Sequence, residues 1–176
     1  MSKIIYYVAS SIDGFIAGPN DDISDFVAGG NGVDKYLSDL KNFKTVIMGR
    51  RTYEFGYQYG LEPGQPAYPH MEHFIFSDSL KIEKIAKKIH VEPKSIARVK
   101  EIKNAADTDI YLCGGGEFAG WLLNNGLIDQ LKLKLNPIIL GEGIRLFGKS
   151  TKKVKWKLLE TEIFDEGLRI LTYDIK

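Results

Sequence analysis

Short apolar runs alternate with amphipathic segments over the first two thirds of the chain. Runs without polar alternation predict strands buried on both faces, at 4–9, 45–48, 73–76 and 109–113. Apolar positions three and four residues apart predict helices over 34–43, 95–106 and 118–123. Because strands and helices alternate, we expect a mostly parallel sheet with helices on both faces.

The pattern changes in the last third of the chain. Residues 129–140 form one long strand pattern. Residues 154–164 and 168–175 predict two antiparallel strands, which a tight turn at 165–167 joins into a hairpin. The expected fold class is therefore α/β, with a mixed, mostly parallel central sheet and a C-terminal antiparallel hairpin. Residues 56–72, rich in Gly, Pro and Tyr, predict a surface loop.

Composition narrows the class of protein. The 176 residues contain no internal repeat or linker pattern, which indicates a single domain over 1–176. A net charge of +1 produces no strong electrostatic field that would attract nucleic acid or a membrane surface. Cys113 is the single cysteine, which fits a reducing compartment. Without a signal-peptide pattern or a long apolar stretch, we expect a cytoplasmic protein. His70 and His73 lack partners for a metal set, so no metal is expected.

Two loops that follow predicted strands are candidate ligand sites, because open α/β sheets bind ligands where their strands end. Residues 10–18 contain several small residues and two glycines, so they are either a flexible cover for a ligand or an ordinary polar turn. Residues 49–52, Gly-Arg-Arg-Thr, lie between a strand and a helix. A helix start and two arginines suit phosphate, although both arginines could equally lie in solvent.

Two further loops have the same position. Residues 77–79, Ser-Asp-Ser, are a weak candidate because this triplet is also a common helix cap. Residues 114–117, Gly-Gly-Gly-Glu, are a stronger one, since three glycines allow a backbone to approach an anion closely. Their spacing is neither the dinucleotide fingerprint nor a Walker A loop. Cys113 before them is most simply a small core residue.

The order of these motifs resembles the dihydrofolate reductase superfamily. The motifs are Ser-Ile-Asp-Gly-Phe-Ile-Ala, Met-Gly-Arg-Arg-Thr-Tyr-Glu, Phe-Ser-Asp-Ser and Tyr-Leu-Cys-Gly-Gly-Gly-Glu. Residues 126–129 and 136–143, followed by Leu146 and Phe147, look like the C-terminal reductase domain of bifunctional riboflavin biosynthesis proteins. The resemblance spans nearly the whole chain and implies a central sheet of eight or nine strands flanked by helices.

The resemblance implies NADPH as the cofactor. Backbone groups at the nicotinamide would come from Ala9, Ile16 and Ala17. The phosphates would be held by Gly49, Arg50, Arg51 and Thr52. Ser77 and Asp78 would lie by the adenosine ribose. The pyrophosphate would be cradled by Cys113, Gly114, Gly115, Gly116 and Glu117. The acceptor also needs a proton, which Asp34, Asp13 or a water would supply.

The implied activity is that of an NADPH-dependent reductase of a small heterocyclic substrate, similar to amino(phosphoribosylamino)uracil reductase of riboflavin biosynthesis. Two alternatives remain: a dihydrofolate or other pteridine reductase, and a nucleotide-binding protein without catalysis. The resemblance also implies a homodimer through the C-terminal part of the sheet. Leu131, Leu133 and Leu135 alternate with lysines there, so one strand face is apolar and is either core or interface.

Overall fold

The computed structural model describes residues 1–175 and contains one large mixed sheet. Its eight strands have the spatial order β5-β4-β3-β6-β1-β7-β10-β9. In chain order they are β1 (Ile4–Ser10), β3 (Thr45–Gly49), β4 (Glu72–Phe76), β5 (Ile89–Glu92), β6 (Ile110–Gly114), β7 (Gln130–Leu135), β9 (Trp156–Ile163) and β10 (Arg169–Ile175). Neighbours from β5 to β7 are parallel, whereas β10 runs antiparallel to both β7 and β9. The predicted fold class is confirmed, including the C-terminal hairpin.

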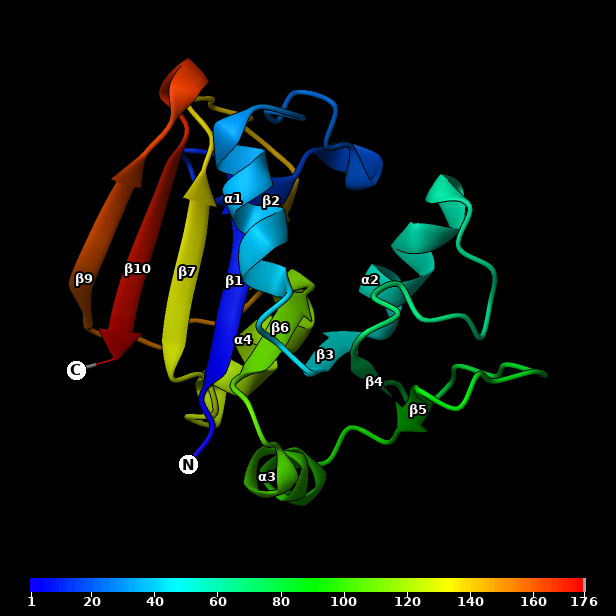
Figure 1. The fold of residues 1–176 in the computed structure, drawn as a ribbon. Helices are drawn as coiled ribbons and strands as arrows, with labels where there is room; N and C mark the ends of the chain where they lie inside the picture. The colour runs from blue at the N-terminus through cyan, green and yellow to red at the C-terminus, as the bar shows by residue number, and fades with distance from the viewer. Residues whose placement is uncertain (176) are drawn as a thin grey trace.

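Four helices cover the two faces of this sheet (Figure 1). They are α1 (Asn31–Leu40), α2 (Arg50–Phe55), α3 (Ile96–Ala105) and α4 (Gly116–Asn124). Strand β1 shows the two layers directly, because Ile4 and Tyr6 pack into the core under α3 and α4. Its alternate residues Ile5 and Tyr7 pack into the second core, under α1 and α2. The central strands therefore need apolar residues at every position.

Some boundaries differ from those that the sequence predicts. The strand predicted over 129–140 ends at Leu135, because the chain turns away from the sheet at Asn136. The Asn136 side chain stabilises this turn. Its Oδ1 accepts a hydrogen bond from the Val27 N–H (2.9 Å), and its Nδ2 donates one to the Lys134 carbonyl (3.2 Å). The segment beyond this turn contributes β8 (Ile144–Arg145) to a separate ribbon with β2 (Phe15–Ala17). Neither ribbon strand nor β5 was predicted, since each is only two to four residues long.

Helix α1 is fixed to the sheet by an ionic cluster around Asp39. Its carboxylate accepts hydrogen bonds from Lys35 Nζ (2.6 Å), Lys132 Nζ (2.6 Å) and Tyr7 Oη (3.1 Å). Burial alone would raise the pKa of Asp39, but the two lysines outweigh it and hold that pKa below its ordinary value. This contact positions the inner face of α1 over β1 and β7.

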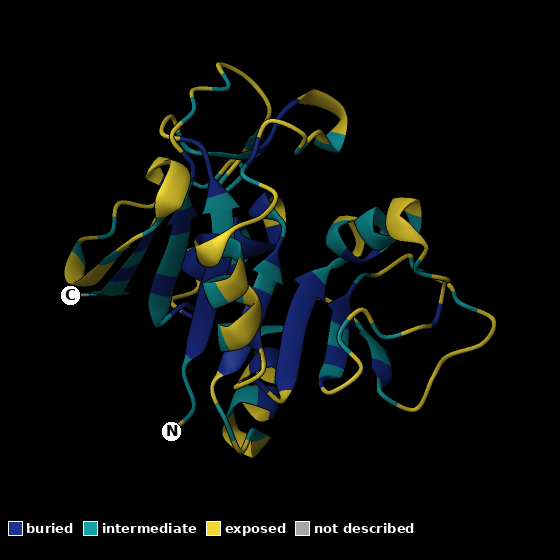
Figure 2. Cartoon of the chain, turned by 45° about the horizontal axis from the view of Figure 1, so that its top comes forward, coloured by how far each residue is buried: buried dark blue, intermediate teal, exposed yellow. Residues whose placement is uncertain are grey.

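Burial follows the layered arrangement (Figure 2). The middles of β1, β3 and β6 are buried, whereas the outer strand β9 is mostly exposed. Three short 3-10 turns, Pro19–Asp21, Gly56–Tyr59 and Asp165–Gly167, lie in connecting loops. Within residues 1–175, no helix combines the length and apolar character needed to cross a bilayer.

Candidate functional site

A large cavity opens where β1, β3 and β6 end, on the side of the sheet that α1 and α2 cover. Its volume is about 720 Å³, which is within the usual range for a small-molecule site. Glycine-bearing loops and two arginines line one part of it, and tyrosines and aliphatic side chains line the rest. One continuous space therefore joins a polar region to a largely apolar chamber.

The polar region includes the start of α4. Gly115, Gly116 and Glu117 line the cavity there, and the first helical turn leaves backbone N–H groups without intrahelical partners. A Cβ on Gly115 would lie 3.0 Å from Thr52 Oγ1, so this glycine keeps the gap between the two loops open. A Cβ on Gly116 would instead meet the Arg145 carbonyl oxygen at 2.1 Å, so packing requires that glycine. The arrangement suits the close approach of an anion to the backbone.

Two arginines flank the same region at the start of α2. The Arg50 guanidinium donates to Glu54 (2.8 Å) and to Ser79 Oγ (3.0 Å). Arg51 pairs with Asp21 at 3.1 Å and its side chain is 73% exposed. Such exposed ion pairs contribute little to folding, so both guanidinium groups can exchange these partners for a phosphate at small cost.

The ribbon of β2 and β8 borders the cavity beside β1. Ala9 at the end of β1 and Ile16 and Ala17 of β2 all line it. The ribbon is held close, because Gly143 approaches the Ala17 backbone so tightly that a Cβ would lie 2.1 Å from the Ala17 oxygen. These residues present backbone and small side chains to a ligand, as the resemblance implied for a nicotinamide site.

Phenol groups form the inner wall of the chamber. The hydroxyls of Tyr36 and Tyr111 are 2.6 Å apart, and the Tyr68 hydroxyl lies 3.7 Å from Cys113 Sγ. Burial raises the pKa of all three tyrosines, so they stay neutral at physiological pH. Burial also raises the pKa of the Cys113 thiol, which keeps it protonated and unsuited to nucleophilic attack.

Lys134 of β7 reaches the same wall, and the sequence analysis did not select it. Its residue is only 8% exposed, and its Nζ lies 5.3 Å from the centroid of the Tyr36 ring. The alternation of leucine and lysine in this strand marked only the leucine face, as core or interface. The sequence pattern could not show that Lys134 pairs with Ala9 in β1. This pairing places the lysine face of β7 under α1.

The structure brings most of the predicted cofactor residues together. The predicted residues that line the cavity are Ala9, Ile16, Ala17, Gly49, Arg50, Arg51, Thr52, Cys113, Gly115, Gly116 and Glu117. Those that do not line it are Asp13, Asp34, Ser77, Asp78 and Gly114. Ser77 Oγ instead accepts a hydrogen bond from the Leu80 N–H (3.0 Å), and Asp78 accepts one from the Lys94 N–H (3.2 Å). Ligand contacts for all these residues stay predictions.

Neither predicted proton donor faces the chamber. The Asp13 carboxylate accepts hydrogen bonds from Ser11 Oγ (2.6 Å), the Leu140 N–H (3.1 Å) and the Gly141 N–H (2.7 Å). These bonds, led by that from Ser11, lower the pKa of Asp13 and keep it ionised. Asp34 is exposed in the first turn of α1. The role of either carboxylate in proton transfer stays a prediction.

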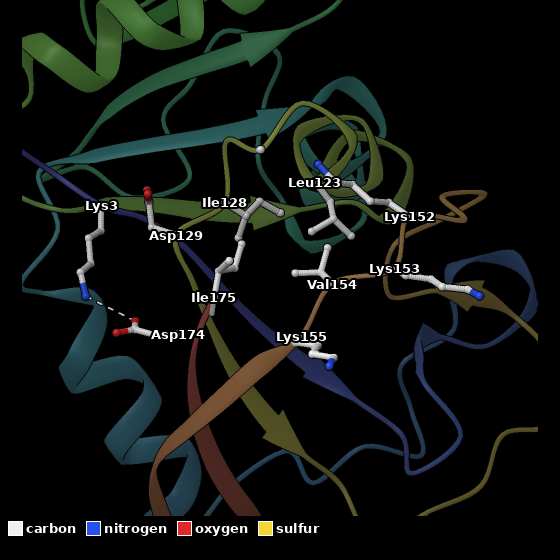
Figure 3. A pocket seen from close by; sticks show the side chains of 11 residues that line it. Lys3, Leu123, Ile128, Asp129, Lys152, Lys153, Val154, Lys155, Asp174 and Ile175 are labelled. Carbon is white, nitrogen blue, oxygen red and sulfur yellow. Dashed lines mark hydrogen bonds and ion pairs between the residues drawn. The ribbon is translucent and has the colours of Figure 1, made fainter.

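A second hollow of about 700 Å³ lies at the opposite end of the sheet, beside the start of β1. Figure 3 shows Leu123, Ile128 and Val154 gathered around it, with the ion pair between Lys3 and Asp174 (3.3 Å) at its border. It lies at the amino end of the parallel strands, away from the glycine loops. Its position is not one where open α/β sheets bind ligands.

The comparisons with known proteins agree with this fold. The model of the RibD C-terminal domain matches residues 2–170. The chain belongs to the RibD C-terminal domain family. The predicted resemblance to this family is therefore confirmed, and its fold is shared with a dihydrofolate reductase. The uncharacterized Bacillus subtilis protein YyaP is 26% identical to it over 97% of this chain and 94% of its own.

Two solved structures show how widely this RibD-type fold is shared. A putative riboflavin biosynthesis protein from Shewanella sp. PV-4 superposes with a TM-score of 0.82 at 20% identity, over 100% of this chain and 99% of its own. A dihydrofolate reductase from Enterococcus faecalis, complexed with NADP(H), gives a TM-score of 0.70 at 15% identity, covering 99% and 96%. Identities this low establish the fold alone.

Proposed function

We propose that this domain is an NADPH-dependent reductase of a small heterocyclic substrate. The observation that carries the proposal is the single cavity that joins the Gly115–Thr52 gap and the two arginines to a phenol-lined chamber. A dinucleotide needs both features in one space, since its phosphates require donors and its nicotinamide requires a dry surface facing the substrate. The NADP(H) complex of the dihydrofolate reductase with the same fold supports this cofactor.

The family supports a proposal for the substrate class. We propose an aminopyrimidine ribotide related to amino(phosphoribosylamino)uracil, which the family name and the relatives named for riboflavin biosynthesis support. A dihydrofolate or other pteridine is the second candidate, supported by the fold shared with dihydrofolate reductase. Asp34, one of the predicted proton donors, is exposed outside the cavity lining and so does not distinguish the two candidates.

Bound NADPH would supply the hydride. The chain's own residues would orient the reacting rings and exclude water from them. The backbone at Ala9, Ile16 and Ala17 would orient the nicotinamide ring beside the end of β1. The wall formed by Tyr36 and Tyr111 would exclude water from the reacting faces, because both hydroxyls are already hydrogen-bonded to each other. The reaction also takes up one proton, for which Asp13, Asp34 or a water remains the proposal.

Direct titration tests the cofactor, and a consumption screen tests the substrate. We expect NADPH to bind the purified protein, and to be oxidised in the presence of one member of a panel of aminopyrimidine ribotides, pterins and simple imines. Oxidation with a pterin alone would select the second candidate. Binding without oxidation by any member would select the non-catalytic nucleotide-binding protein. No binding of NADPH or NADH at millimolar concentration would contradict the proposal.

Arg51→Ala tests the preference between cofactors. We expect it to weaken NADPH binding by about tenfold and NADH binding much less, since a charge-assisted bond to a phosphate contributes roughly 1.5–3 kcal/mol. Fluorescence titration with both cofactors measures the difference. An equal loss for the two cofactors would assign Arg51 to the shared pyrophosphate.

A further inference from the structure

Two lysines on β7 occupy similar places with different partners. Leu131 and Leu133 pack into the core under α3 and α4, so Lys132 and Lys134 point to the side of α1. Lys132 Nζ donates to Asp39 at 2.6 Å and lies 4.9 Å from the centroid of the Tyr7 ring. Across residues 1–175, Lys134 Nζ makes no hydrogen bond or ion pair, and its one charge-related contact is the Tyr36 ring.

An ammonium group in this situation is costly. Taking a charge out of water without a counter-ion disfavours the folded state, and a single aromatic face offsets only part of that cost. The same burial lowers the pKa of Lys134. A methionine or leucine would fill the position without this cost. Lys134 therefore has no counter-charge within the described residues, and an anionic ligand in the cavity that it lines would supply one.

The surroundings of Lys134 indicate where that charge would lie. Lys134 lines the cavity and pairs in register with Ala9, which lies next to the proposed nicotinamide position. The adjoining wall is largely apolar, with Phe26, Tyr36 and Leu37 among its members. The other cationic side chains of this cavity, Arg50, Arg51 and Lys94, follow other strands and lie at its cofactor end. The lysine thus combines one positive charge with a surface for a planar ring.

We propose that Lys134 binds an oxyanion carried on the planar ring of the substrate, or directly next to it. The inference deepens the proposed function and rests on it for the use of this cavity as a substrate site. It restricts the substrate to compounds with a carboxylate, a phosphate or an ionised ring oxygen within reach of the ring that accepts the hydride. A neutral ring of the same shape would leave the ammonium unpaired and would bind more weakly.

A matched pair of variants tests the claim without any ligand. Lys134→Met removes the unpaired charge, so we expect a melting temperature equal to or above that of the unmodified protein. Lys132→Met removes a partner of Asp39, so we expect a lower melting temperature, because a half-buried carboxylate loses one of its two lysines. If Lys134→Met lowered the melting temperature as much as Lys132→Met, Lys134 would be a structural residue and the proposal would be wrong.

Rigid aromatic probes test the ligand chemistry. Naphthoate, naphthyl phosphate and neutral naphthamide share one ring system, and calorimetry measures their binding. We expect at least one of the two anions to bind the unmodified protein about tenfold more tightly than naphthamide, the size of one charge-assisted bond. The preferred anion identifies the group that Lys134 accepts. In Lys134→Met this preference should disappear, whereas Lys132→Met should retain it.

Two outcomes would overturn the proposal. One is equal binding, or no binding, of anionic and neutral probes to the unmodified protein at millimolar concentration. The other is an anion preference that persists in Lys134→Met, which would place the anion on the arginines. NADPH titration of the same variants separates this inference from the proposed function. Loss of the anion preference with unchanged NADPH binding supports Lys134 as the residue that binds the anion. Failure of NADPH to bind the unmodified protein contradicts the reductase proposal alone.

Discussion

Buried polar residues show what single side chains contribute to this protein. His73 at the edge of the second core is fully buried and has two backbone partners. Its Nε2 accepts a hydrogen bond from the Tyr68 N–H (3.1 Å), so its Nδ1 carries the proton that it donates to the Met71 carbonyl (3.0 Å). The imidazole is thus held neutral and fixes the turn before β4. Lys134, by contrast, has no such partners among residues 1–175.

Folding stability should decrease in mild acid because of His73. Burial lowers its pKa from 6.5 to about 4, so the unfolded chain binds a proton in this range that the folded chain does not. The contribution is fully present above pH 6.5 and is lost as pH falls toward 4, by up to about 3 kcal/mol. Urea unfolding at several pH values measures the slope. His73→Asn should be less stable at neutral pH but should show a flatter dependence; an unchanged slope would exclude His73 as its source.

Gly115 is the glycine whose replacement should affect ligand binding most directly. Its φ of −88° is open to any residue, so the constraint is steric, and the positive φ lies at Gly114 instead. Gly115→Val would fill the gap to Thr52, and we expect a loss of NADPH affinity of about tenfold or more, from an overpacking cost of about 1–3 kcal/mol. Titration measures it, with Gly29→Val, at an open position, as the control. Equal affinity in both variants would make Gly115 a structural glycine only.

At the scale of elements, the short ribbon of β2 and β8 is the part most dependent on long-range packing. Its strands are 127 residues apart at the pair Ala17 and Ile144, and each is too short to be stable alone. Backbone contact takes the place of side-chain packing, since Gly143 lies directly against Ala17. The ribbon forms one border of the cavity, so its stability and ligand binding should be coupled.

Replacing Gly143 tests this coupling with a control in the same loop. Gly143→Ala and Gly141→Ala both place alanine at a positive φ, of 136° and 78°, but only the first brings a Cβ within 2.1 Å of the Ala17 oxygen. We expect Gly143→Ala to be the less stable variant by about 1–3 kcal/mol, and to bind NADPH more weakly. Thermal unfolding and titration measure the two effects. Similar behaviour of the two variants would show that the close contact is not required.

At the scale of the whole molecule, the sheet ends in an exposed strand with apolar side chains. Leu158 and Ile163 of β9 are 50% and 68% exposed, and Leu159 is 48% exposed. The leucines of β7, which the sequence suggested for an interface, lie inside the sheet between β1 and β10, and Leu131 is buried. An exposed edge strand with several apolar side chains offers a surface on which a second chain can pair.

We therefore predict a homodimer that uses β9. Light scattering at micromolar concentration should give a mass near twice the 19.8 kDa of one chain. Ile163→Lys should shift the protein toward a single chain, because a lysine at this exposed position opposes edge pairing. Lys157→Glu, another exposed change on β9, serves as the control for a general effect of charge. A mass of one chain for the unmodified protein would contradict the dimer, and the cavity would be unaffected because one chain supplies all its walls.

The sequence by itself determined the layered sheet and the glycine-bearing loops that line the cavity. The buried strands contain three or more apolar residues in a row, and the glycines and arginines of 49–52 and the glycines of 114–117 are adjacent in sequence. Tertiary structure decided the tyrosine-lined chamber that Lys134 joins. Strand alternation puts Lys134 on the opposite face from Leu133, but only the pairing of β7 with β1 and the position of α1 make that face an enclosed wall. Burial depends on residues far apart in sequence, so the local pattern of leucine and lysine could not reveal it.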